Sequence, residues 1–471
     1  MGRPIGVRDP RTGATDHTLV CADAAEVGAA AERARAAQPG WLALGATGRV
    51  AALRSFRDAL ASRDEAMLDA LVRDTGRLPV SRLEVDSVLA SLDRWCVRAP
   101  ELLASDGTVP TSMPGIALRQ EPLPYPLVGA ISPWNFPLLL AMIDAVPALL
   151  AGSAVLLKPS EITPRFAEVL RECVAAVPEL DGVLTVVDGD GATGAAVVDV
   201  VDLICFTGSV RTGRAVGAAA AARFIPAFLE LGGKDPAIVC ADADLDRAAR
   251  AILFGGTVNT GHSCMSIERV YVAEPVADRF VDLLVARARK VGLAYPGPAD
   301  GELGPVISAA QIGIIEDHLA DAVARGATVH CGGEVRVLGG GAYVEPTVLT
   351  GVDHGMRIMR EETFGPILPV MPFADADEAV ALANDSEYGL SAAVFASTTE
   401  AAMEIGLRLE AGGISVNDAS LTGFVMDGEK NAFKSSGLGG SRMGPASLRR
   451  FYRQRSFLIR DPRDTALWWF A

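Results

Sequence analysis

Two short segments carry residues that could do covalent chemistry. The segment LELGGK at 229–234 contains Glu230, and the segment NTGHSC at 259–264 contains Cys264. A cysteine thiolate can attack an electrophilic carbonyl, and a nearby carboxylate can activate the water that later releases the product. Glycines beside both side chains let backbone and ligand approach closely. A cysteine in a loop does not by itself predict a catalytic role. Its combination with Glu230, in a chain where strands and helices alternate, favours Cys264 as a nucleophile and Glu230 as a general base.

Size and charge limit the classes of protein to which the chain could belong. It has 471 residues, of which 50% are hydrophobic and 21% are charged, and its formal net charge is −15. Such a length exceeds what one hydrophobic core normally supports, so we expect two or three domains. The negative charge disfavours nucleic acid and anionic membranes as partners, because both would be repelled.

The cysteines and the N-terminus predict a reduced, cytoplasmic protein. The seven cysteines are odd in number and scattered, without a Cys-x-x-Cys spacing, and the first residues show no apolar signal region. Residues 136–157 are long and apolar enough to cross a bilayer, but Asp144 and Pro147 interrupt them. We therefore predict a buried helix followed by a buried strand there, and no membrane span.

Apolar spacing and turn residues predict the elements that must position the reactive side chains. The first hundred residues are helical in pattern, and a turn-rich stretch near 105–120 predicts a hairpin. Strands and helices then alternate as far as 231, and a second alternating region runs over 270–416. We expect strands at 127–131, 154–158, 183–187, 203–206 and 226–231, and helices from about 138, at 165–174 and at 214–222.

This alternation indicates parallel sheets covered by helices on both faces, in which ligands bind at the carboxyl ends of the strands. The boundary between the two alternating regions falls near 232–233, so Glu230 and Cys264 would flank a domain interface, where substrate and cofactor commonly meet. The C-terminal segment 448–471 ends in the aromatic sequence LWWF at 467–470. Such a tail either folds back on its own core or is buried between subunits, and we favour the subunit interface.

Three further segments could bind a phosphate, a sugar or an oxyanion. FTGS at 206–209, followed by Gly213, could hold a pyrophosphate on backbone amides, with a plain strand-to-helix turn as the alternative. KPSE at 158–161 could hold ribose hydroxyls, with a solvated loop as the alternative. PWNFP at 133–137 fixes Asn135 between two prolines, which aims its amide as an oxyanion hole requires; the alternative is a structural turn.

Histidine does not explain the reactivity expected of Cys264. A free thiol has a pKa of roughly 8.5, so it needs local help to react at neutral pH. His262 lies two residues away, but that spacing in a loop does not guarantee contact, so a Cys–His pair is the less favoured hypothesis. No second histidine stands near a carboxylate with metal-ligand spacing, and we expect no metal site.

Taken together, these segments resemble the aldehyde dehydrogenase superfamily over nearly the whole chain. The matching segments are PWNFP at 133–137, LKPSE at 157–161, FTGS at 206–209, LELGGK at 229–234, NTGHSC at 259–264, EETFGP at 361–366, and Asn384 with YGL at 388–390. The resemblance implies a Rossmann-like NAD-binding domain of residues 1–104 and 125–232 and an α/β catalytic domain of residues 233–440. It also implies a small β oligomerisation element of residues 105–124 and 441–471, in which a strand near 456–459 joins the hairpin, and assembly as a homodimer or homotetramer.

The resemblance also implies a role for each residue of the site. Cys264 would form a thiohemiacetal with an aldehyde and then a thioester, Asn135 and the Cys264 amide would hold the oxyanion, and Glu230 would activate the hydrolytic water. A carboxylate at Glu161 should repel a 2′-phosphate, which favours NAD, although Lys158 could tolerate NADP. The cofactor contacts would be Ile131, Pro133, Trp134, Lys158, Ser160, Glu161, Gly208, Ser209, Leu231, Gly232, Glu362 and Phe364.

Two alternatives and two departures accompany the resemblance. The alternatives are a CoA-acylating enzyme, against which Glu230 argues, and a non-catalytic protein that retains the fold. His262 occupies a position where the family mostly carries Gln or Glu, and the segment NAFKSSG at 431–437 lacks the usual paired glycines. An apolar entrance formed by Trp134, Phe136, Met265, Phe424 and Met426 suggests aromatic or medium aliphatic aldehydes.

Overall fold

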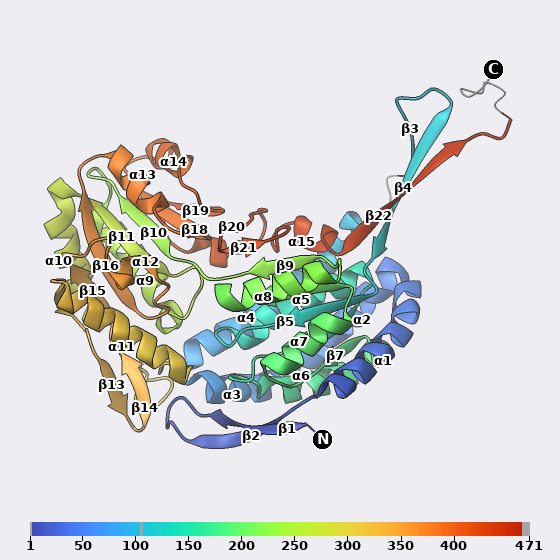
Figure 1. Ribbon diagram of the computed structural model, residues 1–471, viewed down its shortest axis with the longest axis horizontal. Helices are drawn as coiled ribbons and strands as arrows, with labels where there is room; N and C mark the ends of the chain where they lie inside the picture. The colour runs from blue at the N-terminus through green and yellow to red at the C-terminus, as the bar shows by residue number, and fades with distance from the viewer. Residues whose placement is uncertain (1, 104–106, 464–471) are drawn as a thin grey trace.

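A six-stranded sheet forms the centre of one half of the molecule. The structure, a computed structural model, describes residues 2–103 and 107–463 (Figure 1). The strand order is β21 (Gly437–Leu438), β9 (Ala227–Glu230), β8 (Leu203–Thr207), β5 (Leu127–Ile131), β6 (Ala154–Lys158) and β7 (Leu184–Val186). The last five strands in that order run parallel, and β21 pairs antiparallel at the edge. The helices of this half are α1 (Ala24–Ala43), α2 (Gly45–Ala61), α3 (Asp64–Thr75), α4 (Leu78–Leu102), α5 (Pro137–Ala151), α6 (Phe166–Ala175), α7 (Gly191–Val200) and α8 (Val210–Ala222).

A seven-stranded sheet forms the other half. Its order is β12 (Thr328–Cys331), β15 (Thr347–Thr350), β16 (Ile367–Phe373), β11 (Ile267–Ala273), β10 (Asp235–Val239), β18 (Ser391–Phe395) and β19 (Gly413–Val416), and all its neighbours are parallel except β12 and β15. Around it lie α9 (Leu245–Thr257), α10 (Ala277–Ala288), α11 (Ala309–Ala324), α12 (Arg357–Arg360), α13 (Ala376–Asn384) and α14 (Thr399–Gly406). Small pairs are formed by β13 (Val335–Leu338) with β14 (Gly341–Val344) and by β17 (Tyr388–Gly389) with β20 (Phe433–Lys434). The predicted α/β class with parallel sheets is confirmed.

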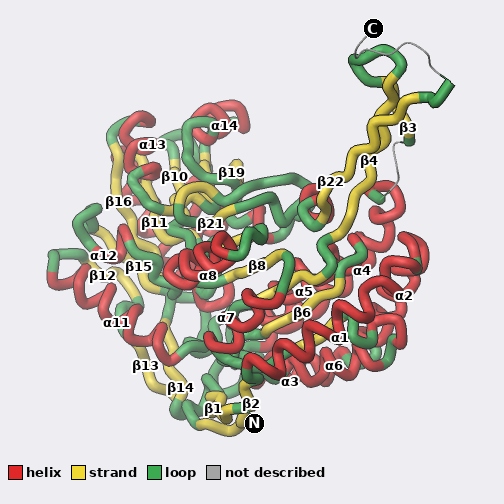
Figure 2. The backbone as a smooth tube through the Cα atoms, turned by 45° about the vertical axis from the view of Figure 1, so that its right-hand side comes forward, coloured by secondary structure: helices red, strands yellow, loops and turns green. Residues whose placement is uncertain are grey.

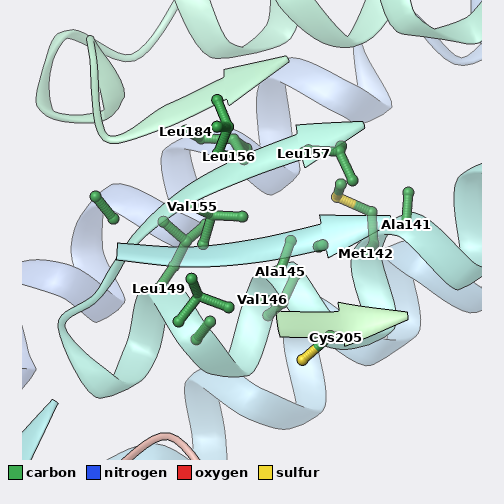
Figure 3. Packing of buried hydrophobic residues seen from close by; sticks show 14 of the residues in the cluster. Ala141, Met142, Ala145, Val146, Leu149, Val155, Leu156, Leu157, Leu184 and Cys205 are labelled. Carbon is green, nitrogen blue, oxygen red and sulfur yellow. The ribbon is translucent and has the colours of Figure 1, made fainter. Parts of the chain in front are cut away.

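The apolar stretch at 136–157 is a buried helix and strand, as predicted. Pro137 stands in the first turn of α5, where a missing N–H costs nothing, and Gly152 ends the helix in the left-handed conformation. Figure 3 shows Met142, Val146 and Leu149 of this helix among the side chains of the central strands. Fully burying one such side chain contributes roughly 1.5–3 kcal/mol. Within the described residues, no helix has the length and apolarity that a bilayer crossing demands.

The prediction that the first hundred residues are helical is wrong for the first twenty or so. The strands β1 (Arg3–Arg8) and β2 (Thr15–Cys21) form an antiparallel hairpin. Its turn closes through the N–H of Gly13, which donates to the Asp9 carbonyl, and Gly13 has a φ of 71° that favours glycine. Val7 and Leu19 are buried between more exposed neighbours in these strands. Such an alternation, with a period of two residues, is typical of a strand, and the helical prediction overlooked it.

A three-stranded arm projects from the body. It consists of β3 (Thr108–Pro110), β4 (Ile116–Pro124) and β22 (Tyr452–Arg460), paired antiparallel, so the predicted hairpin and C-terminal strand are confirmed (Figures 1 and 2). Apolar side chains on the arm are exposed, with Leu458 72% accessible. The aromatic sequence at 467–470 lies outside the described residues.

A buried charge cluster ties α5 to the segment that precedes the arm. Arg442 donates a hydrogen bond of 2.8 Å to Asp144 of α5, and Arg450, just after α15 (Ala446–Arg449), pairs with the other oxygen of the same carboxylate. All three side chains are at most 8% exposed. The two arginines hold the pKa of Asp144 below its ordinary value against the opposing effect of burial. The negative charge of Asp144 therefore compensates the positive charges of the two buried arginines.

Replacing this carboxylate should destabilise the fold. Asp144→Asn leaves two buried guanidinium groups without an anion, and we expect the free energy of unfolding to fall by about 3–5 kcal/mol. Chemical denaturation followed by circular dichroism measures the change. Asp377→Asn, which removes the exposed partner of Arg408, is the control and should leave the midpoint nearly unchanged. Equal midpoints for both variants would contradict the assigned role of Asp144.

Candidate active site

The nucleophile candidate follows a short strained turn between the two sheets. Cys264 lies between η2 (Val258–Gly261) and β11 and is half-buried. Asn259 and Thr260 of η2 have φ values of 62° and 57°, a conformation that L-residues rarely adopt. The turn is held by buried contacts, since the Thr260 hydroxyl donates to the Gly304 carbonyl at 3.1 Å. Such strain costs on the order of 1–3 kcal/mol per residue and persists only where its surroundings fix it.

Hydrogen bonds join Asn135 to this turn. The Asn135 amide Nδ2 donates to the His262 carbonyl at 3.0 Å, and Asn259 donates to both the His262 and the Asn135 carbonyls at 2.9 Å. An amide NH₂ carries two hydrogens, so one of those on Asn135 stays free for another acceptor. The structure therefore places the predicted oxyanion donor beside the nucleophile turn.

Sequence reasoning missed two buried residues that hold Asn135 in place. Arg77, just before α4, donates to the Asn135 carbonyl at 2.6 Å. Glu84 of α4 accepts the N–H groups of Leu138 and Leu139, both at 3.2 Å, at the start of α5. Burial raises the pKa of Glu84 to about 8 and lowers that of Arg77 to about 9. No local pattern could have revealed them, because they lie more than 50 positions from their partners.

Ten of the predicted site residues line one pocket with Cys264 among them. This Cys264 pocket encloses about 530 Å³. Its lining consists of Pro133, Trp134, Asn135, Thr207, Gly208, Ser209, Leu231, Gly232, Cys264, Gln311, Glu362 and Phe364. Thr207 and Gln311 were not among the predicted site residues. Thr207 lies within the segment 206–209 that was interpreted as a possible phosphate site, which was the available signal, whereas nothing local marks Gln311.

The remaining predicted residues lie at strand ends outside that lining. Ile131 and Lys158 end the paired strands β5 and β6, and the Lys158 ammonium contacts the Glu161 carboxylate at 3.0 Å. Ser160 is buried, and its hydroxyl accepts the N–H of Ile162 in a local turn. Glu230 ends β9 and is half-buried. Among the described residues, no hydrogen bond or ion pair engages its carboxylate.

Carboxylates surround the thiol. Burial and the nearby Glu362 carboxylate raise the pKa of Cys264 to about 12, and Glu230 and Asp235 act in the same direction. Glu362 accepts the Gly233 N–H at 3.0 Å, and its own pKa is raised to about 8 by burial and by Glu268. The arrangement therefore disfavours the thiolate unless a positive charge is supplied.

His262 does not activate Cys264 by a hydrogen bond. Its ring is fully buried, and neither ring nitrogen has a hydrogen-bond partner among the described residues. Burial lowers its pKa well below the ordinary value, so the ring is neutral. It packs edge-on against Trp134 at 5.2 Å and lies 5.9 Å from the Phe364 ring.

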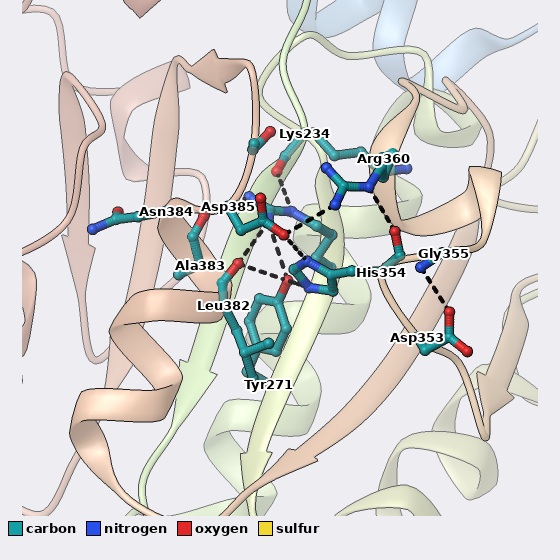
Figure 4. A network of polar contacts seen from close by, with 12 residues as sticks. Lys234, Tyr271, Asp353, His354, Gly355, Arg360, Leu382, Ala383, Asn384 and Asp385 are labelled. Atoms are coloured by element: carbon teal, nitrogen blue, oxygen red, sulfur yellow. Dashed lines mark hydrogen bonds and ion pairs between the residues drawn. The ribbon is translucent and has the colours of Figure 1, made fainter.

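The loop that carries Glu362 and Phe364 is held from both sides. Glu268 of β11 accepts the N–H of Thr363 at 2.7 Å and that of Phe364 at 2.8 Å, and also binds the Lys234 ammonium. Figure 4 shows the second anchor, in which Arg360 donates to the His354 carbonyl and to Asp385 just before the loop. These contacts set the position of Glu362 from the seven-stranded sheet.

A second pocket is lined mainly by residues of α4 and α5, and we name it the α4–α5 pocket. It encloses about 830 Å³. Its lining consists of Ser87, Val88, Ala90, Ser91, Arg94, Trp95, Leu139, Met142, Ile143, Val146, Gly423, Phe424, Met426, Arg442, Met443, Gly444 and Ser447. Arg442 of this lining donates at 2.9 Å to the hydroxyl of Thr207, which lines the Cys264 pocket. Of the five residues expected at an apolar entrance, Phe424 and Met426 line this pocket, Trp134 lines the Cys264 pocket, and Phe136 and Met265 line neither.

The side chains gathered in the Cys264 pocket suit acyl chemistry. No group of three metal-ligating side chains occurs in residues 2–103 and 107–463. A thiol, an amide donor and the Glu362 carboxylate line one cleft, beside the start of α8, where backbone N–H groups and the helix dipole favour an anion.

Comparison with known proteins agrees with this chemistry. The sequence matches the aldehyde dehydrogenase family over residues 2–457. The fold superposes on "Putative Aldehyde Dehydrogenase PutA" from Anabaena variabilis with a TM-score of 0.98, 55% identity and full coverage of both chains. The chain is 40% identical to 4,4'-diapolycopene aldehyde oxidase of Methylomonas sp, over 80% of this chain and 71% of that protein. It is 38% identical to an NADP(+)-linked "Putative succinate-semialdehyde dehydrogenase" of Mycolicibacterium smegmatis, over 93% and 85%. The chain belongs to the aldehyde dehydrogenase family.

Proposed function

We propose that the protein oxidises an aldehyde to a carboxylic acid with NAD(P) through a thioester on Cys264. The observation that carries this proposal is the single pocket that combines Cys264 and Asn135 with Gly208, Ser209 and Glu362. The sulfur would add to the aldehyde carbon, and the free hydrogen of the Asn135 amide would bind the oxyanion that forms. One oxyanion-hole donor of this kind is worth about 3 kcal/mol of transition-state stabilisation.

The residues fit a dinucleotide. Gly208 and Ser209 precede the 13-residue helix α8. On the pocket wall, a Cβ at Gly232 would lie only 2.6 Å from the Glu362 carboxylate, so the glycine leaves room beside Glu362. Glu362 and Phe364 would hold the nicotinamide side, and Lys158 with Glu161 the adenosine ribose. When bound, an oxidised nicotinamide would supply the hydride acceptor that oxidation of the thiohemiacetal requires.

Glu230 would complete the cycle. Its carboxylate forms no hydrogen bond or ion pair with another described residue, and it stands near enough to Cys264 to raise the pKa of the thiol. It would take a proton from water as the water attacks the thioester carbon. The carbon–sulfur bond then breaks, the carboxylic acid leaves, and the thiol is restored.

The α4–α5 pocket supports an apolar substrate. Its wall includes seven apolar side chains from α4 and α5, together with Phe424, Met426 and Met443. Arg442, which lines it, donates to the hydroxyl of Thr207, which lines the Cys264 pocket. We propose that aromatic or medium aliphatic aldehydes enter here and present their carbonyl to Cys264.

We also propose the domain and assembly scheme implied by the family. The cofactor domain would comprise residues 1–104 and 125–232, the catalytic domain 233–440, and the arm with the C-terminal segment the oligomerisation element of a homodimer or homotetramer. The exposed apolar side chains of β22 support this role for the arm. All seven cysteines are free thiols, which is consistent with a reducing cytoplasm.

Removing the thiol tests the reaction class. Cys264→Ala should reduce the formation of NADH or NADPH to background with every aldehyde of an aliphatic and aromatic panel, as followed by absorbance. Cys331→Ala, which removes a half-buried thiol of β12, is the control and should retain turnover. If wild type converts no aldehyde, or if Cys264→Ala stays active, the proposed reaction is wrong.

Removing the base separates the two halves of the reaction. Glu230→Gln should slow steady-state turnover by about 10²–10⁴-fold, because general base catalysis contributes that much. The first turnover should persist, and mass spectrometry should detect an acyl group on the peptide that contains Cys264. Rapid steady-state turnover restored by coenzyme A in this variant would favour the CoA-acylating alternative instead.

Glu161 tests the preference for NAD. Its carboxylate already neutralises Lys158, which leaves that ammonium less able to bind a 2′-phosphate. Glu161→Gln should raise kcat/KM for NADP relative to NAD by about tenfold, the factor that corresponds to 1.4 kcal/mol. Glu168→Gln, at an exposed position of α6, serves as the control. An unchanged ratio in Glu161→Gln would remove the basis for the preference.

A further inference from the structure

Phe364, on the wall of the Cys264 pocket, has a strained backbone. Its φ is 51°, in the left-handed region that residues other than glycine rarely adopt. Its ring packs edge-on against Trp134, with the two ring centroids 5.4 Å apart. Such strain persists only where the surrounding structure fixes the residue, and it gathers at functional sites. The contacts that hold Phe364 in this conformation therefore need an explanation.

Every polar atom of the preceding residue, Thr363, is bound by a buried side chain. Its N–H donates to the Glu268 carboxylate at 2.7 Å, and its carbonyl accepts a hydrogen bond of 2.7 Å from the Gln311 amide. Its hydroxyl accepts a hydrogen bond of 3.1 Å from the Lys234 ammonium and lies 3.1 Å from Nδ1 of His318. These four side chains come from β11, from α11 and from the residue directly before β10.

The Thr363 hydroxyl gives this network a direction. The Lys234 ammonium has no acceptor, so the hydroxyl oxygen accepts a hydrogen from it, and the hydrogen of the hydroxyl is left for His318. Burial lowers the pKa of His318, so its ring is neutral and Nδ1 can accept that hydrogen. The ring proton is then on Nε2, which lies 3.4 Å from the Glu361 carboxylate. The hydroxyl therefore joins a buried ammonium to a buried imidazole.

The same loop touches the nucleophile turn. Gly261 ends η2 with a φ of 73°, and a Cβ there would lie 2.2 Å from the carbonyl carbon of Gly365 and 2.7 Å from the nitrogen of Pro366. Only glycine allows the two backbones to come this close. The loop that carries Phe364 is therefore fixed against the turn that leads to Cys264.

We propose that Thr363 is a positioning residue whose hydroxyl, held between Lys234 and His318, fixes the loop 362–364 for the nicotinamide half of the cofactor. The inference rests on the proposed function, in which that loop holds the nicotinamide side. Without the hydroxyl, the ammonium and the imidazole lose their common partner, and the loop can leave its strained conformation. The adenosine half, assigned to the end of β6, should not depend on Thr363.

Nucleotide binding tests the proposal without an aldehyde. Thr363→Val removes the hydroxyl but keeps the shape of the side chain, and Thr363→Ser keeps the hydroxyl. Quenching of tryptophan fluorescence measures the affinity for NADH and NADPH, and titration calorimetry measures that for ADP and 2′,5′-ADP. We expect Thr363→Val to bind the reduced dinucleotides about three- to tenfold more weakly, the size of one lost hydrogen bond. It should bind the two adenosine nucleotides as wild type does, and Thr363→Ser should resemble wild type throughout.

Hydrogen exchange tests the loop itself, in the absence of any nucleotide. The N–H groups of Thr363 and Phe364 both donate to Glu268, so their exchange reports how firmly the loop is held. Mass spectrometry of the peptide that contains residues 361–366 should show faster exchange in Thr363→Val than in wild type. Thr363→Ser should exchange at the rate of wild type.

Thr350→Val is the matched control. The Thr350 hydroxyl also faces a histidine ring, with Nε2 of His330 at 2.7 Å, but it belongs to β15 and lines neither pocket. This variant should leave nucleotide binding and exchange in the loop unchanged. Thermal melting verifies folding, and Thr363→Ala replaces Thr363→Val if the latter does not fold.

The outcomes are distinct. Equal affinity of wild type and a folded Thr363→Val variant for the reduced dinucleotides would overturn the proposal, as would unchanged exchange in the loop or an equal loss of affinity for the adenosine nucleotides. A wild type that binds a dinucleotide but oxidises no aldehyde would overturn the proposed reaction and leave this inference standing. A wild type that binds neither dinucleotide would overturn the assigned cofactor and this inference together.

Discussion

The hydrogen bonds that converge on the Asn135 carbonyl constrain the rest of the site. Asn135 follows β5 of the six-stranded sheet, whereas Asn259 belongs to the turn that leads into the seven-stranded sheet. Arg77 binds the same carbonyl from a third element. All three side chains are buried, so losing one partner would leave an unpaired polar group at a cost of about 1–3 kcal/mol. The spacing between amide and thiol is therefore set by both halves of the molecule together.

That constraint also explains how a strained turn survives. Two consecutive left-handed residues, Asn259 and Thr260, direct the chain toward Cys264, and each is fixed by its own side-chain hydrogen bond. The site they form is rich in carboxylates, which keeps the thiol protonated and so less exposed to unwanted reaction. Reactivity of the thiol then depends on where positive charge is placed.

Much of the framework could be predicted because its signals are local. The runs 127–131 and 154–158 are strands by their continuous apolar character, and Gly76 and Gly152 end helices where turn residues predict an end. The hairpin β1–β2 was missed because helical character further along the chain was extended over it. Arg77, Glu84 and Gln311 could not be found, because each acts on a backbone group that is distant in sequence.

The sequence by itself determined the chemistry available to this protein: a thiol, an amide between prolines, strand-end carboxylates and the alternation that brings strand ends to one edge. These features follow from the types of residues and from their spacing over short stretches of the sequence. Only the tertiary structure decided that Asn135 binds the turn before Cys264, that the ring of His262 is buried and neutral, and that carboxylates surround the thiol. Burial and charge proximity depend on contacts between distant segments, and no local pattern encodes them.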